Sequence, residues 1–135
     1  MSAKPLYGSS TSVTITLNSL ANGSSANSNE INNTTNLALE DELTVNLTGS
    51  NAAESGIAEV FILRGDATSA IDDDGNAQRV GFVTLNGTTA VQKTIRVPDL
   101  PPFYKYRLTH TSSATYALGA SGNSMDVRSV NIQDV

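Results

Sequence analysis

The chain has 135 residues and a net charge of −5, with no Cys, no Trp and a single His. This acidity argues against nucleic acid or an anionic membrane surface as a partner, because both require a basic footprint on the protein. The shortage of reactive side chains argues against an enzyme, and a chain of this length can bury the core of one domain without disulfides or metal ions.

Residues 1–11 are predicted to form a polar N-terminal arm, and residues 12–135 a single β-sandwich domain. The arm carries one small apolar anchor, and we expect it either to contact a neighbouring subunit or to dock on its own domain. The residues expected to make that contact are Lys4, Pro5, Leu6 and Tyr7.

Short runs of alternating apolar residues, separated by Ser, Thr, Asn and Gly, follow the arm. This pattern predicts an all-β antiparallel β-sandwich or jelly roll of about eight strands. The first strand is expected over residues 12–20, and an Asn- and Ser-rich loop over residues 22–36. Residues 37–47 are expected to form a strand pair or one long bent strand. The later strands are expected over residues 57–64, 79–85, 90–97, 103–109, 114–118 and 124–132.

The core is expected to consist of the apolar residues that alternate along these strands. They are Val13, Ile15, Leu17, Val45, Val60, Ile62, Val83, Ile95, Tyr106, Leu108 and Val127. The continuous apolar run over residues 60–63 further suggests a strand that is buried on both faces.

The segment that contains Leu100, Pro102 and Tyr106 resembles the L-x-P-x-x-x-Y pattern of fibronectin type III domains and related sandwiches. In those domains the Tyr hydroxyl bonds to nearby backbone and ties a corner between two strands. The resemblance therefore implies that the Tyr106 hydroxyl bonds to backbone around residues 100–102.

The candidate chemical motifs are weak. Asp72, Asp73 and Asp74 before Gly75 could hold calcium, but an EF-hand template fails at its first and last positions, and a solvated turn is the simpler interpretation. The Arg-Gly-Asp tripeptide at 64–66 is interpreted as a turn. His110 is expected at the surface end of a strand, with no metal-binding or triad partner. We therefore predict no catalytic, cofactor-binding or metal-binding residues.

The whole chain is similar in style to the capsid decoration, or cement, proteins of tailed bacteriophages. It shares their acidity, their Ser, Thr, Asn and Gly richness, and the ending that runs from Gly122 to Val135. The resemblance implies a non-enzymatic virion protein, made in the host cytoplasm, that binds the major capsid protein on the outer shell. It would bridge shell subunits and assemble as a homodimer or homotrimer.

Three other functions remain open at this point. The first is a phage tail, fibre or receptor-binding module that recognises carbohydrate or a host surface. The second is an adhesive or carbohydrate-binding module from a larger extracellular protein. The third is a hydrolase, although no pair of carboxylates stands out for acid–base catalysis.

Overall fold

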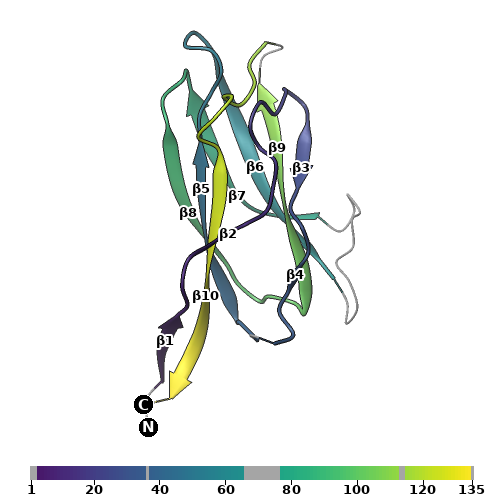
Figure 1. Cartoon of the computed structure of the whole chain (residues 1–135), viewed down its shortest axis with the longest axis vertical. Coiled ribbons are helices and arrows are strands. Elements are labelled where there is room, and N and C mark those ends of the chain that lie inside the picture. The colour runs from purple at the N-terminus through teal and green to yellow at the C-terminus, as the bar shows by residue number, and fades with distance from the viewer. Residues whose placement is uncertain (1–2, 36, 66–76, 113–114, 135) are drawn as a thin grey trace.

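The computed structural model describes residues 3–35, 37–65, 77–112 and 115–134, and two antiparallel sheets of five strands pack face to face in it (Figure 1). Sheet I contains, in order, β1 (Ala3–Tyr7), β10 (Ser124–Asp134), β5 (Glu40–Leu47) and β8 (Val91–Val97), with β2 (Thr11–Ser12) also paired to β10. Sheet II contains, in order, β3 (Ser25–Asn27), β9 (Phe103–Ser112), β6 (Ser55–Arg64) and β7 (Ala77–Asn86), with β4 (Ile31–Asn32) paired to β9.

This arrangement confirms the predicted all-β sandwich. The described residues form no helix, and so no helix that could span a lipid bilayer. The Asn86-Gly87 dipeptide predicts a hairpin between the strands on either side of it, and this prediction is wrong. The turn connects β7 of sheet II to β8 of sheet I, because β7 pairs with β6 and β8 pairs with β5. Gly87 has a positive φ of 60° in this connection.

The core lies between the sheets and is built from the inward-facing residues of every long strand. Most of the predicted core is buried: Leu17, Val45, Val60, Ile62, Val83, Ile95, Tyr106 and Leu108. The other three, Val13, Ile15 and Val127, are only half-buried because they pack at the open side of the sandwich, where no further strand covers them.

The predicted first strand over residues 12–20 is wrong beyond Ser12. The backbone there bonds to both sheets, because Val13 N–H donates to Met125 of β10 while Thr14 C=O accepts from Asn29 next to β3. The segment thus crosses the open side of the sandwich (Figure 1). Its alternation reflects packing into that gap and not membership of a ladder.

Two other boundaries also differ from the prediction. The Asn- and Ser-rich loop over residues 22–36 contains β3 and β4, and Ser28 between them exchanges hydrogen bonds with the Tyr106 backbone. The predicted strand over residues 114–118 is reduced, among the described residues, to a single bridge between Gly49 and Leu118.

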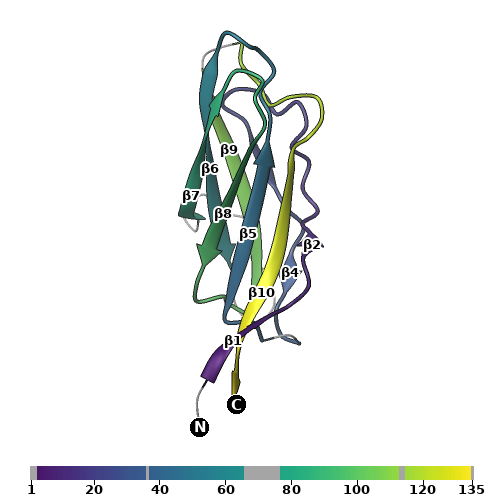
Figure 2. The ribbon, with the colours of Figure 1, turned by 90° about the vertical axis from the view of Figure 1, so that its left-hand side faces the viewer.

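The start of β1 lies beside the end of β10, with Ala3 opposite Asp134. Figures 1 and 2 show this pair of strands projecting as a ribbon beyond one pole of the sandwich. The arm therefore forms an edge strand of its own domain.

Tyr106 is fully buried, but the predicted tyrosine corner is wrong in its partner. The Tyr106 hydroxyl donates to the Asp41 carboxylate at 2.5 Å, and the Tyr104 hydroxyl donates to the same oxygen at 2.6 Å. Asp41 belongs to β5 of sheet I and both tyrosines to β9 of sheet II, so the carboxylate ties the two sheets together. A buried carboxylate offers a stronger acceptor than a backbone carbonyl, which explains the different partner.

We expect Tyr106→Phe to lower the free energy of unfolding by about 1.5–3 kcal/mol, because it removes one hydrogen bond to a buried charged group. Urea unfolding monitored by circular dichroism measures this change. Tyr7→Phe is the matched control, since Tyr7 is 45% exposed and should shift the midpoint little. Equal midpoints for Tyr106→Phe and the wild type would contradict a stabilising role for the hydroxyl.

Candidate functional site

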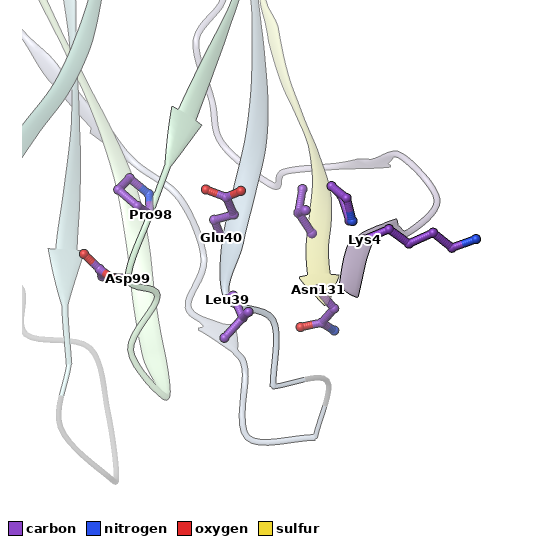
Figure 3. A pocket seen from close by; sticks show the side chains of 8 residues that line it. Lys4, Leu39, Glu40, Pro98, Asp99 and Asn131 are labelled. Carbon is purple, nitrogen blue, oxygen red and sulfur yellow. The ribbon is translucent and has the colours of Figure 1, made fainter. Parts of the chain in front are cut away.

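Two of the arm residues, Lys4 and Pro5, help to line a pocket of about 440 Å³ at the pole where β1 and β10 project (Figure 3). Its walls are Lys4, Pro5, Leu39, Glu40, Pro98, Asp99, Val130 and Asn131. The Glu40 carboxylate is already paired with Arg96 at 2.6 Å, and the Lys4 side chain extends away from the pocket (Figure 3). No aromatic side chain is among these eight residues, so the pocket offers a ligand aliphatic surface but no aromatic ring.

Two of the predicted contact residues, Leu6 and Tyr7, are about half exposed. Tyr7 lies on the outer face of sheet I, with its ring 4.7 Å from the Arg128 guanidinium carbon. The pKa of Arg96 is raised mainly by a hydrogen bond to the Tyr7 side chain and, to a smaller extent, by the hydrogen bond to Glu40. The contact of Lys4, Pro5, Leu6 and Tyr7 with a neighbouring subunit stays a prediction, and these contacts show the arm held by its own sheet.

Arg64 of the Arg-Gly-Asp tripeptide has a structural role. Its guanidinium donates to the Gln78 side chain and to the backbone carbonyls of Pro98 and Asp99. It thereby anchors the connection between β8 and β9, where Asp99 has a positive φ of 56°. Asp66 and the acidic run Asp72, Asp73 and Asp74 lie outside the described residues, so the calcium question stays open.

His110 is completely buried inside β9, and its predicted position at the surface is wrong. Alternation along β9 turns it inward beside Tyr106 and Leu108, and its ring lies 5.7 Å from that of Tyr116. Neither ring nitrogen has a hydrogen bond of ordinary geometry among the described atoms. Burial lowers the pKa of His110, and the backbone of Leu20 opposes this only in part.

We expect His110 to destabilise the fold in acid. The pKa of His110 in the folded protein lies below the ordinary value of 6.5. The contribution of the neutral side chain to the free energy of unfolding is therefore complete above pH 6.5 and is lost as the pH falls through the folded pKa. His110→Phe keeps a ring of similar shape and removes this titration. The urea midpoint of the wild type should therefore fall relative to that of the variant below pH 6.5, and parallel curves would contradict the assignment.

Asp41 also borders a polar cleft of about 400 Å³ between β10 and β4, together with Tyr104 and Asn33. Burial raises the pKa of Asp41, and the hydrogen bonds from the two tyrosines oppose this rise. Burial and the nearby Asp41 charge raise the pKa of both hydroxyls, so they remain donors. The carboxylate is 1% exposed and already engaged by these donors, which favours a structural role over ligand binding.

The raised pKa of Asp41 predicts the opposite pH dependence. The contribution of Asp41 to the free energy of unfolding is complete below its ordinary pKa of 3.8 and is lost as the pH rises through the pKa of the folded state. The reason is that the charged carboxylate is poorly solvated at this buried position. Asp41→Asn keeps an oxygen acceptor without the charge. The difference in unfolding free energy between wild type and variant should then change with pH above 3.8, and a constant difference between pH 3 and 8 would refute this.

The outer face of sheet II brings together side chains from four strands. Alternation along β9 and β6 turns one set of residues outward, and the registers align them in two rows. We call these eight residues the aromatic–polar face. The first row is Asn27, Arg107, Phe61 and Arg79, and the second row is Ser25, Thr109, Glu59 and Phe82.

Contacts within each row hold the polar members of this face in place. Arg107 Nε donates to Asn27 Oδ1 at 2.8 Å, and the Ser25 and Thr109 hydroxyls are 2.7 Å apart. Glu59 pairs with Arg79 at 3.3 Å. Such contacts fix the side chains before a ligand arrives, which lowers the entropic cost of binding.

The two Phe rings occupy different positions on the face. Phe82 is 39% exposed, with Arg79 Cζ at 4.9 Å and Lys93 Nζ at 4.6 Å from its ring centroid. Phe61 is half-buried and lines a depression of about 300 Å³ with Ser25, Ala77, Arg107 and Thr109. The predicted burial of residues 60–63 on both faces is therefore wrong for Phe61.

A β-bulge lies directly at this depression. The register between β6 and β7 shifts between Val60 and Phe61, so that Val80 has no partner on β6. Bulges bend a strand and redirect its side chains, and they are common next to binding sites. The aromatic–polar face can thus offer a ring surface bordered by hydrogen-bonding groups, whereas its one carboxylate, Glu59, is already paired.

Comparison with known proteins shows the fold only. No family model and no curated protein matches the chain. The CBM36-1 domain of a multidomain xylanase from the hindgut metagenome of Trinervitermes trinervoides has a similar structure, with a TM-score of 0.53 at 10% identity over 99% of this chain and 100% of that one. This likeness shows the β-sandwich fold.

Two further solved structures are more distant. One is a carbohydrate-binding module CBM36 in complex with calcium and xylotriose, with a TM-score of 0.48 at 14% identity over 98% of this chain and 100% of that one. The other is the C-terminal CBM6 of a laminarinase from Zobellia galactanivorans, with a TM-score of 0.43 at 10% identity over 97% of this chain and 100% of that one.

A metal centre has no obvious ligands in the described part of the chain. Within those residues no group of three or more His, Cys, Asp and Glu side chains could hold a metal ion.

The sequence does not predict the aromatic–polar face, because the members of this face are far apart in the chain. Phe61 and Phe82 are the two members that the sequence could have indicated, because both are aromatic residues on predicted strands. A Phe on a strand is more commonly a core residue, so neither residue could be distinguished from the core.

Proposed function

We propose that this protein is a non-catalytic carbohydrate-binding β-sandwich module that binds its ligand on the aromatic–polar face. The observation that carries the proposal is the depression lined by Phe61, with hydroxyl and guanidinium groups at its border. A pyranose ring has an apolar C–H face that packs on an aromatic ring, and its hydroxyls lie in plane to meet polar neighbours.

The other concave sites support this function less well. The pocket at the pole has no aromatic lining, and its Glu40 is paired with Arg96. The cleft next to Asp41 is lined by residues that join the two sheets. Only the aromatic–polar face, among the described surfaces, combines two accessible rings with polar groups held in place by contacts with one another.

A non-catalytic role agrees with the chemistry of this face. Hydrolysis of a glycosidic bond needs two carboxyl groups placed on either side of it. Glu59 is the one carboxylate on the described residues of β3, β6, β7 and β9, and Arg79 neutralises it. The function of the face is therefore recognition, which a phage receptor-binding module and an adhesive module would share.

We expect the protein to bind at least one polysaccharide in a panel of neutral and acidic polymers, measured by affinity electrophoresis. Phe61→Ala should weaken that binding about five- to tenfold, because it removes the ring on which a sugar packs. Tyr7→Ala is the matched control, since Tyr7 is an exposed aromatic residue on the outer face of sheet I. Thermal unfolding of each variant verifies that the sandwich remains folded.

Failure to bind any polymer, or full binding by a folded Phe61→Ala protein, would contradict the proposal. In that case the capsid-binding function expected from the sequence becomes the better hypothesis. It stays a prediction, as do the major capsid protein as partner, a homodimer or homotrimer, and a place in the virion. Co-sedimentation with capsids would test it directly.

A further inference from the structure

We propose that the pocket at the pole binds a second copy of this chain, so that the protein forms a two-fold dimer. This contact is independent of sugar binding, because the pocket lies at the end of sheet I and the aromatic–polar face belongs to sheet II. A dimer carries two copies of that face, which raises the avidity for a polymer that reaches both.

The pocket extends across the end of sheet I in the order of its strands. Each of β1, β10, β5 and β8 contributes one apolar residue to the lining. These residues are Pro5 on β1, Val130 on β10, Leu39 directly before β5 and Pro98 directly after β8. Figure 3 shows Pro98, Leu39 and Lys4 following one another across the pocket. The lining is therefore an apolar row with two different ends, one next to β8 and one on β1.

The fold holds two leucines of this pole in solvent. Leu37 is 69% exposed and Leu39 is 50% exposed, whereas Ala38 between them is buried. The buried Asn33 side chain binds both backbone groups of Ala38, donating to its C=O at 3.0 Å and accepting from its N–H at 2.9 Å. Leu37 also has a positive φ of 50°, which is uncommon for a residue with a side chain. The exposure of both leucines is thus built into the backbone.

A second depression continues the apolar surface of the pocket. It has a volume of about 330 Å³, and Leu39 belongs to the lining of both. Its other apolar members are Leu37, Ala38, Leu100, Pro101 and Pro102. Exposed apolar surface that extends over neighbouring depressions is typical of sites where proteins associate.

The charges at the two ends of the row have opposite signs. Lys4 is exposed at the β1 end, and Asp99 is exposed at the β8 end. Neither forms an ion pair within the described residues, since Arg64 donates to the backbone carbonyl of Asp99. The remaining charged member, Glu40, is paired with Arg96.

This arrangement of charge makes the row complementary to itself. A two-fold axis near Leu39 exchanges the two ends, so that Lys4 of one copy lies opposite Asp99 of the second copy, and the reverse contact forms as well. The apolar residues between them then meet each other, as in the isologous contacts of symmetric dimers. An anionic lipid surface fits less well, because the acidic end and the net charge of −5 would repel it.

Sedimentation velocity of the full chain at increasing concentration tests the dimer. Leu39→Thr should weaken dimerisation at least about tenfold, because each dimer loses two buried leucine side chains. Ile57→Thr is the matched control, since Ile57 is 45% exposed on β6 of sheet II and should leave the dimer intact. A wild type that stays monomeric, an assembly larger than a dimer, or a dimer unchanged by Leu39→Thr would overturn the inference. None of these outcomes bears on sugar binding.

Charge reversal tests the two-fold pairing itself. Lys4→Asp and Asp99→Lys should each weaken self-association about tenfold or more, because like charges then meet twice in each dimer. A mixture of the two variants should form a heterodimer, because every contact again joins opposite charges. Circular dichroism verifies the fold, and Lys4→Asp alone tests the contact if Lys is not tolerated at the positive φ of residue 99. Dimerisation unaffected by Lys4→Asp, or two folded variants that do not combine, would refute the pairing.

Discussion

The two sheets are joined through one buried carboxylate. Asp41 accepts hydrogen bonds from the hydroxyls of Tyr104 and Tyr106, and these are groups from opposite layers of the sandwich. A buried charge is tolerated only where donors replace its lost hydration, so Asp41 and the two tyrosines must be positioned together. This requirement fixes how β5 faces β9 in a core that is otherwise built mainly from apolar side chains. Because inward and outward side chains alternate along each strand, the position of β5 relative to β9 also determines which side chains lie on the outer faces of the two sheets.

The outer faces then differ because of what each register places side by side. In sheet I the pairing of β5 with β8 and β10 sets Glu42 between Arg96 and Arg128, and the charges neutralise one another. In sheet II the pairing of β6 with β9 and β7 sets Phe61 between Arg107 and Arg79, so the guanidiniums border a ring. The same strand periodicity thus produces a surface of paired carboxylates and guanidiniums on one side and a surface with two Phe rings on the other.

The sequence predicts the sandwich and most of its core because alternation is a local property. It predicts poorly where a contact depends on pairing between distant segments. Residues 13–20 alternate like a strand, yet they cross the gap between sheets. Asp41 precedes Leu43, Val45 and Leu47 at the same two-residue period, so the alternation is enough to predict its inward position. Its hydrogen-bond partners cannot be predicted in this way, because the two tyrosines lie more than 60 residues away in the chain. The aromatic–polar face combines four strands and a bulge, neither of which local spacing specifies.

The ribbon of β1 and β10 gives the molecule a distinctive response to mechanical tension. Ala3 lies opposite Asp134, and the two strands run antiparallel from that point into the sandwich. A force that separates the two strand ends loads their hydrogen bonds one pair at a time, as in opening a zipper, and not all together in shear. The arm would therefore detach at low force, while the tie between Asp41 and the tyrosines of β9 carries no load until β10 itself is pulled away.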